Sequence, residues 1–332
     1  MTQHSKFPEM PDNQPESDNG SLIERAAMAF DFRRLSAPPV PAGVVAPEPV
    51  VVTDRAVISR DDAAVMRDRV ENTGSVDGVE RPEPAEFGGI RHSVDREHLR
   101  DQGLIVPEGT VTALLEEFRI IKRQLLVQAS ELVRLGGGPA AQRVLICSPH
   151  PGEGKTYCAV NLALSIASEK ESDVLLVDAD FAKPSVLSVL GLPGGRGLMD
   201  ALADPSIDVL DCVIGTDIPG LWVLPAGGAT NSDSEYLNSS RTRVVLDRLT
   251  QGKSNRMVIF DSPPALAASP AAELARHVGQ AVVIARADRT GQGALEDAVS
   301  LLSACPNIQL VLNAINFSPS GRKFGSYYGY GG

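Results

Sequence analysis

The chain has 332 residues, a formal net charge of −11 and a hydrophobic fraction of 43%, enough apolar material for one or two domains with a sizeable core. The acidic balance excludes a broad nucleic-acid-binding surface, because such surfaces need clustered Lys and Arg. The four cysteines show no paired spacing, which excludes zinc and iron–sulfur centres and predicts reduced, mostly buried thiols in a cytoplasmic protein. No run approaches the roughly 18 apolar residues of a membrane span, so we expect recruitment to the inner face of a membrane only through a partner.

The first part of the chain, residues 1–94, is predicted to be a largely disordered extension. It holds ten of the 24 prolines and lacks long apolar periodicity. A short capped helix is expected near residues 21–30, because Ser21 stands three residues before Glu24 at the start of a short apolar face. A second short helix is expected at residues 95–103, ended by Gly103.

A longer helix is predicted for residues 111–135. Apolar residues recur there near helical spacing and charged residues fill the positions between them. A run of Gly and Pro at residues 136–139 ends the pattern. The apolar positions are Leu114, Leu115, Phe118, Ile121, Leu125 and Val127.

Beyond residue 141, short apolar runs alternate with helical patterns. The runs are too apolar for half-exposed strands, so we expect strands buried on both faces. They are Arg143–Cys147, Val174–Val177, Leu221–Leu224, Met257–Phe260, Ala281–Ala285 and Gln309–Leu312. Helices are expected between them at residues 156–169, 239–251, 271–277 and 294–304. This alternation predicts an α/β fold, a mostly parallel β-sheet flanked by helices, in a domain of residues 95–318. Ligands in such sheets bind beyond the carboxyl ends of the strands.

The loop after the first of these strands predicts a nucleotide site and assigns the fold to the P-loop NTPase class. Its glycines let backbone N–H groups close around phosphates, and the helix that follows adds positive potential. Lys155 can reach the β- and γ-phosphates, and the Thr156 hydroxyl can ligate Mg²⁺. Pro149 stands where the generic pattern has Gly or Ala, so the loop is a deviant form. The residues expected to bind the nucleotide are Pro151, Gly152, Glu153, Gly154, Lys155, Thr156 and Tyr157.

Two further strands end in aspartates, as a nucleotide site of this kind requires. Asp178 and Asp180 follow one strand, and they are expected to take different roles. In one division of roles, Asp178 faces the γ-phosphate and accepts a proton, while Asp180 helps to hold the water shell of Mg²⁺. Asp261 ends another strand and can anchor Mg²⁺ or its waters. With Lys155, these three are the predicted catalytic residues, and Thr156, Asp180 and Asp261 are the predicted metal site.

Asn313 ends the last apolar run and has two readings. Its amide offers a donor and an acceptor, which suits an adenine edge, but an Asn at this position also suits a simple turn.

The tail of residues 319–332 carries three of the five tyrosines, Tyr327, Tyr328 and Tyr330, among glycines. Tyrosines flanked by glycine near a chain terminus can enter the active site of another subunit at low steric cost. The alternative is an aromatic, adhesive tail.

Together these motifs resemble the bacterial tyrosine-kinase (BY-kinase) family, and most of all its stand-alone tyrosine autokinases from exopolysaccharide gene clusters, including those associated with exosortase systems. The runs at residues 148–156, 178–184 and 260–264 match the family's Walker A, A′ and B motifs. The similarity covers residue 97 to the C-terminus, and residues 21–27 also resemble the start of such proteins.

The resemblance implies an ATP- and Mg²⁺-dependent autokinase that phosphorylates its own C-terminal tyrosines between subunits of a ring and regulates exopolysaccharide synthesis or export. It also implies a membrane polysaccharide co-polymerase, or chain-length protein, as the activating partner. Glu116, Arg119 and Lys122 resemble the family's Glu-x-x-Arg-x-x-Arg oligomerisation motif, although Lys lacks the bidentate fork of Arg. A solvated amphipathic helix is the alternative reading of that segment.

A second class of protein remains open, the partition- or septum-placement-type ATPases that switch binding partners with their nucleotide. Those proteins share the deviant loop but carry a signature lysine at the position of His150, and the membrane-placing ones end in a basic amphipathic helix. This chain has His at that position and ends in Gly and Tyr. Both features favour the kinase.

Overall fold

The computed structural model describes residues 84–228 and 232–315. Contacts divide the chain into residues 1–77 and 78–332, and all described residues belong to the second unit. The expected helix at residues 21–30 and the tail tyrosines lie outside the described residues.

The described unit is built on a sheet of eight strands in the order β1-β4-β5-β3-β6-β2-β7-β8. All neighbouring strands are parallel except β4 and β5, which form an antiparallel pair. The strands are β1 (Arg91–His92), β2 (Arg143–Cys147), β3 (Asp173–Asp178), β4 (Ile214–Thr216), β5 (Leu221–Leu224), β6 (Arg256–Asp261), β7 (Gln280–Arg286) and β8 (Ile308–Asn313). The predicted α/β architecture is confirmed.

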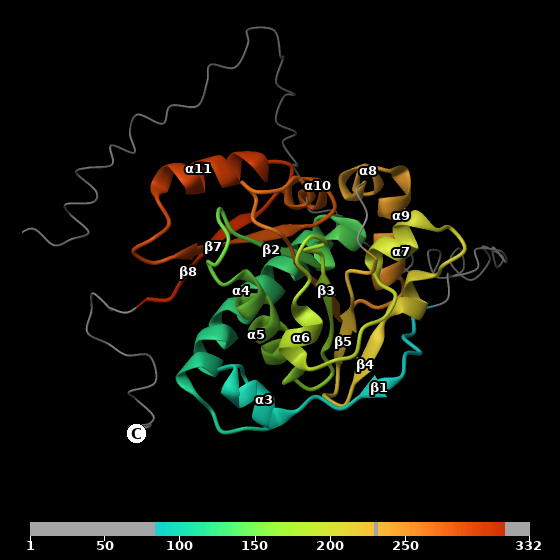
Figure 1. The fold of residues 1–332 in the computed structure, drawn as a ribbon, viewed down its shortest axis with the longest axis horizontal. Coiled ribbons are helices and arrows are strands. Elements are labelled where there is room, and N and C mark those ends of the chain that lie inside the picture. Colours follow the sequence, from blue (N-terminus) through green and yellow to red (C-terminus); the bar gives the residue numbers. More distant parts are fainter. Residues whose placement is uncertain (1–83, 229–231, 316–332) are drawn as a thin grey trace, which may run out of the picture. The chain divides into compact units, whose positions relative to one another are not determined.

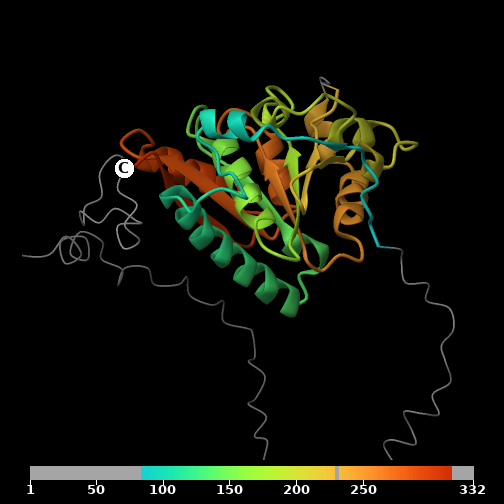
Figure 2. The same cartoon turned by 90° about the horizontal axis from the view of Figure 1, so that it is seen from below.

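Helices cover both faces of this sheet (Figure 1). One apolar cluster joins one face to α3 (Arg96–Asp101), α4 (Ala113–Arg134), α5 (Lys155–Ala167) and α6 (Val186–Leu190). The other cluster joins the opposite face to α7 (Leu198–Ala203), α8 (Asp233–Leu237), α9 (Ser240–Thr250), α10 (Pro270–Ala275) and α11 (Gln292–Leu301). Two short 3₁₀ helices, at Gly138–Gln142 and Val209–Cys212, also belong to the unit. In Figure 2, α4 is the long green helix that runs along the outside of the first face.

All six predicted strands are present, but the expectation that each is buried on both faces is wrong for β8. In β8, Leu310 is 58% exposed and Leu312 is 52% exposed, and β8 is an edge strand of the described sheet, beside β7. The strands between the edges, such as β2 and β6, are buried along their whole length, as predicted.

The two predicted N-terminal helices form where expected, and each has a side-chain cap. Asp95 accepts hydrogen bonds from the backbone N–H groups of Glu97 and His98 at the start of α3, and Gly103, with a φ of 68°, follows its end. At the start of α4, the Thr112 hydroxyl accepts a hydrogen bond from the N–H of Leu115. Such caps satisfy N–H groups that have no partner within the helix.

Residues 84–94, here called the strap, run along one edge of the sheet. They precede residue 95, which the sequence predicts as the start of the domain. Phe87 is 8% exposed and packs against the Arg256 guanidinium, which lies 3.6 Å from the ring centroid. The same guanidinium donates to the carbonyl of Ala85 at 2.9 Å and pairs with Asp173 at 2.8 Å. The strap then adds β1 to the sheet beside β4.

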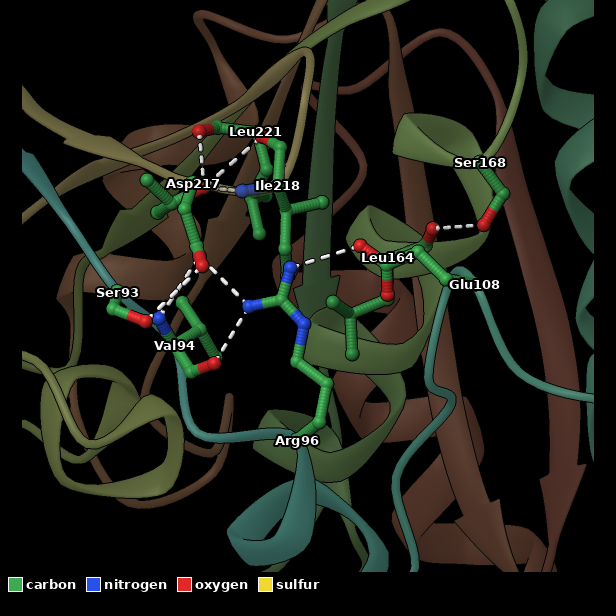
Figure 3. A network of polar contacts seen from close by, with 10 residues as sticks. Ser93, Val94, Arg96, Glu108, Leu164, Ser168, Asp217, Ile218 and Leu221 are labelled. Carbon is green, nitrogen blue, oxygen red and sulfur yellow. Dashed lines mark hydrogen bonds and ion pairs between the residues drawn. The ribbon is translucent and has the colours of Figure 1, made fainter.

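Arg96 secures the end of the strap (Figure 3). Its guanidinium donates to the Val94 carbonyl at 2.6 Å and to Asp217 in the β4–β5 turn at 2.7 Å. It also pairs with Glu108, ahead of α4, at 2.8 Å. One side chain thus ties the strap to the hairpin turn and to the segment that leads into α4.

All four cysteines are free and buried, as the sequence predicts. Within the described ranges, no helix combines the length and the apolar character needed to cross a membrane.

Candidate functional site

The predicted phosphate loop joins the end of β2 to the start of α5 at the carboxyl edge of the sheet. Gly152 and Gly154 have φ values of 76° and 95°, which favour glycine. A Cβ on Gly154 would also lie 2.2 Å from the amide nitrogen of Asn313. Because α5 begins at Lys155, the free N–H groups of its first turn face the loop, as a phosphate site requires.

Glu153 is the buried charged residue of this loop, with 2% of its surface exposed. Its Oε2 accepts from the N–H of His150 at 2.8 Å, and its Oε1 accepts a short hydrogen bond from the Thr290 hydroxyl. The sequence names Glu153 among residues that contact the nucleotide. In the structure its carboxylate instead ties the loop to itself and to the segment after β7.

Asp261 is a buried carboxylate at the end of β6. It is 0% exposed, and among residues 84–228 and 232–315 no donor meets either carboxylate oxygen at full hydrogen-bond geometry, although the Thr156 hydroxyl lies near enough to affect it. Burial raises its pKa to about 7, against the opposing effects of the nearby Thr156 hydroxyl and Lys155. An orphaned buried carboxylate is costly, so this group fits a site completed by a bound cation.

Asp178 lies opposite Asp261 in the register of β3 and β6, but its carboxylate accepts three backbone hydrogen bonds. Its Oδ2 accepts from the N–H groups of Ser185 and Val186 at 2.8 and 2.9 Å, and its Oδ1 accepts from the N–H of Asp180 at 3.2 Å. Burial raises its pKa to about 6, although these N–H groups lower it. The residue predicted as a base therefore also shapes the loop between β3 and α6.

Five predicted residues meet in one cluster. Asp178, Asp180, Lys155 and Thr156 all influence the pKa of Asp261. Lys155 is 8% exposed, while Asp180 is half-buried and accepts a hydrogen bond from the N–H of Lys183 at 3.1 Å. Asp178 ends β3 and Asp180 lies beyond it, and the two carboxylates make different contacts.

Ser185 is a member of this cluster that the sequence did not single out. Its hydroxyl lies 3.3 Å from that of Thr156, so a second hydroxyl stands beside the predicted metal ligand. Ser185 carries no motif signal of its own, and only the path of the chain after Asp178 brings it here.

Asn313 and Tyr157 also make protein contacts at the site. The Asn313 amide nitrogen donates to the Glu153 carbonyl at 2.9 Å, and its oxygen accepts from the N–H of Ala314 at 2.8 Å. One donor and one acceptor are thus used within the protein, and the other N–H and lone pair remain for a base edge. The Tyr157 hydroxyl donates to the Gly103 carbonyl at 2.8 Å, which joins α5 to the segment ahead of α4.

The predicted oligomerisation residues do not share one face of α4. Lys122 is 4% exposed, donates to the Ser165 carbonyl at 2.9 Å and pairs with Glu169 at 2.9 Å. Its inclusion in a surface motif is therefore a correction to the sequence reading, because it faces α5. Glu116 and Arg119 form an ion pair across one helical turn, and the neighbouring exposed cation is Arg123.

The cluster fits Mg²⁺ through few protein ligands. No group of three or more His, Cys, Asp and Glu side chains at metal-binding distances occurs in the described part of the chain. Nucleotide-bound Mg²⁺ needs no such cage, since phosphates and waters supply most of its ligands. The Thr156 hydroxyl and the Asp261 carboxylate can supply the few protein ligands that such a Mg²⁺ ion needs.

Comparisons with known proteins agree with this geometry, although no protein-family model matches the chain. The chain is 31% identical over 188 residues to tyrosine-protein kinase YwqD of Bacillus subtilis, which covers 57% of this chain and 76% of that protein. It is 32% identical over 190 residues to EpsB of Ralstonia nicotianae, which covers 56% of this chain but 24% of that longer protein. The chain thus spans about a quarter of the length of EpsB.

Among solved structures, the kinase domain of the Escherichia coli tyrosine kinase ETK has the same fold. The match has a TM-score of 0.54 at 21% identity and covers 70% of this chain and 92% of that domain. Since the similarity to YwqD extends over most of that relative, the chain belongs to the bacterial tyrosine-kinase family.

Proposed function

We propose that this protein is an ATP-dependent protein-tyrosine autokinase that transfers the γ-phosphoryl group to its own Tyr327, Tyr328 and Tyr330. The transfer takes place between subunits of a homo-oligomeric ring, and it regulates exopolysaccharide synthesis or export. Family membership supports the reaction type, and the chain itself contains the three acceptor tyrosines.

The observation that carries the proposal is the unpaired, fully buried carboxylate of Asp261 beside Thr156 and Lys155. In a phosphoryl-transfer site, Mg²⁺ held at such a carboxylate neutralises charge on the phosphates. Lys155 and the N–H groups at the start of α5 hold the triphosphate, and they stabilise the charge that develops on the transferred group.

Asp178 is the proposed base. A base works best when its pKa lies near the operating pH, and the pKa of Asp178 is about 6. The tyrosine oxygen forms a bond to the γ-phosphorus as the bond from that phosphorus to ADP breaks, and the hydroxyl proton passes to Asp178. The hydrogen bonds from Ser185 and Val186 keep the carboxylate in one orientation for this step.

The proposed partner is a membrane polysaccharide co-polymerase, or chain-length protein, that activates the kinase and recruits it to the inner face of the membrane. The proposal is in keeping with the name of a curated relative from Klebsiella pneumoniae, a tyrosine-protein kinase in the cps region.

The test is incubation of the purified full-length protein with MgATP, followed by intact-mass measurement and phosphotyrosine mapping. Wild type is expected to gain phosphate within residues 327–330. Lys155→Met is expected to gain none, because the cation that holds the phosphates is lost. The variant with Tyr327, Tyr328 and Tyr330 all replaced by Phe is the matched control, expected to bind ATP normally without accepting phosphate.

ATP turnover without phosphotyrosine, even with the membrane partner supplied, would overturn the kinase and favour a nucleotide-switch ATPase. The side chain of His150 is exposed at the loop, where such ATPases have a fixed lysine cation. A His is only partly protonated at neutral pH, which favours the kinase over that alternative.

A further inference from the structure

The phosphate loop is contacted from one side by three residues that belong to no nucleotide-binding motif of the chain's Walker A, A′ or B segments. Arg286, Thr290 and Asn313, here called the clasp, lie at the end of β7, in the turn that follows it and at the end of β8. Arg286 donates to the Gly152 carbonyl at 3.2 Å, and Asn313 donates to the Glu153 carbonyl at 2.9 Å.

Thr290 makes the contact of the clasp that reaches the Glu153 carboxylate. The N–H of Arg286 donates to the Thr290 hydroxyl oxygen at 2.8 Å, and the Thr290 hydroxyl in turn donates to the carboxylate of Glu153. The N–H of Thr290 closes the same turn by donating to the Arg286 carbonyl at 3.0 Å. The direction of the contact is therefore fixed: Thr290 supplies a proton donor to a buried anion.

Glu153 needs that donor because of its position. It is a buried carboxylate within a loop shaped to receive a triphosphate, so its charge opposes that of the ligand. Its two oxygens are satisfied by the His150 N–H and the Thr290 hydroxyl. Without the hydroxyl, one oxygen would be left buried and unpaired, which drives the carboxylate, and the loop with it, toward water.

We propose that Thr290 is a positioning residue for nucleotide binding, which acts through Glu153 to hold the phosphate loop in its binding shape before the nucleotide arrives. This rests on the proposed function only in that the loop binds a nucleotide. A loop that is ordered before binding loses less conformational entropy when the nucleotide binds. Thr290 is therefore expected to increase the affinity for the nucleotide.

The test compares Thr290→Val with Thr290→Ser in the full-length protein, by calorimetric titration with MgADP. Valine keeps the shape and removes the donor, and it is expected to raise the Kd about tenfold. Serine keeps the donor and is expected to leave the Kd within about twofold. Thr216→Val is the control, because the Thr216 hydroxyl likewise hydrogen-bonds within the protein, but in the β4–β5 turn at the other end of the sheet.

A second variant separates positioning from general stability. Glu153→Gln in the Thr290→Val background removes the buried charge, so it is expected to recover most of the lost affinity without restoring the hydroxyl. An unchanged Kd in Thr290→Val, an equal loss in Thr290→Ser, or no recovery in the double variant overturns the proposal. A Kd in Thr216→Val that rises as much as in Thr290→Val also overturns it.

The two proposals fail differently. Absence of phosphotyrosine in wild type overturns the kinase and leaves the titration intact, because nucleotide affinity is measured without phosphoryl transfer. Unchanged affinity in Thr290→Val overturns the role of Thr290 and leaves the kinase standing.

Discussion

Two carboxylates in register on neighbouring strands, Asp178 and Asp261, have different surroundings. The Asp178 carboxylate accepts three backbone hydrogen bonds, whereas the Asp261 carboxylate accepts none from the residues that the structure describes. Burial raises both pKa values, and it raises that of Asp261 further, to about 7 against about 6. This difference supports two separate roles. Asp178 orders its loop and is held in the orientation of a base, whereas Asp261 is suited to bind a cation.

Asp261→Asn is predicted to stabilise the nucleotide-free protein in a pH-dependent way. The pKa of Asp261 in the folded state is raised above its unfolded value of 3.8, to about 7, so the folded state binds more protons between these values. Its burial therefore costs little below pH 4, and the cost grows as the pH rises to about 7. The Asn variant is expected to gain stability over wild type across this range, by at most about 4 kcal/mol at pH 8.

Urea unfolding of both proteins at pH 5 and pH 8 measures this difference. Asp180→Asn is the matched control, because Asp180 is only half-buried and bonds to a backbone N–H. A stability gain for Asp261→Asn that is equal at both pH values would contradict the prediction. In MgADP the variant is expected to lose its advantage, since the cation then compensates the wild-type charge.

At the scale of single residues, the sequence predicted the cluster but not all of its contacts. Lys155, Thr156 and Asp261 follow from motifs whose chemistry is local to a strand end. The partners of Glu153 and the approach of Ser185 to Thr156 depend on how separate loops pass one another. No spacing along the chain contains that information.

At the scale of elements, α4 shows how a helical pattern can hide the orientation of one residue. The apolar positions predicted its length closely, from Ala113 to Arg134. Lys122 lies on the apolar face, where it snorkels to the end of α5. The resemblance to the oligomerisation motif grouped Lys122 with Glu116 and Arg119, and the spacing of that motif does not reveal that Lys122 is buried against α5.

The elements missed by the sequence reading are the short ones. β1, β4, α6, α7 and α8 are between two and six residues long, too short to show a period of 2 or 3.6 above chance. The exposure of β8 was missed for another reason, since an apolar run does not reveal whether its strand has one neighbour or two.

Substitutions of the neighbouring residues Lys122 and Arg123 are predicted to affect different properties, the first the stability of the fold and the second self-association. Lys122→Ala leaves the Ser165 carbonyl without its buried donor and is expected to cost about 2 kcal/mol of stability. Arg123→Ala changes an exposed residue and is expected to alter stability by less than about 0.5 kcal/mol, but to weaken self-association if the exposed face of α4 carries it.

Urea unfolding and sedimentation velocity on the same samples measure the two effects. Ser130→Ala, an exposed change two helical turns along α4, serves as the control for both. Weakened association by Lys122→Ala at unchanged stability would restore Lys122 to the surface motif and count against the buried position seen here.

At the scale of the whole folded unit, the strap is part of the core rather than a lead-in to it. Ala85 is 0% exposed, Phe87 is 8% exposed and Val94 is 1% exposed. Arg256, 2% exposed, depends on the strap for two of its contacts, with Phe87 and with the Ala85 carbonyl. No apolar period marks the strap along the chain, because it crosses the sheet edge with irregular backbone and adds only the two residues of β1.

A pair of truncations is therefore predicted to differ in stability. The two proteins begin at residue 84 and at residue 95, and both lack residues 1–83, so the difference between them isolates the strap. Loss of the strap removes three buried apolar side chains and leaves the Arg256 cation buried with fewer partners. Truncating a buried Phe alone costs about 3–5 kcal/mol, and a buried charge that loses partners adds to this.

Urea unfolding of the two truncated proteins gives the difference, which is expected to be at least about 3 kcal/mol. Phe87→Ala in the full-length protein is the matched point variant, and it is expected to account for the larger part of the loss. Ile90→Ala lies in the same strap but changes a side chain that is 78% exposed, so it is expected to cost little. Equal stability of the two truncations would mean that the core closes without the strap, and that Arg256 finds other partners.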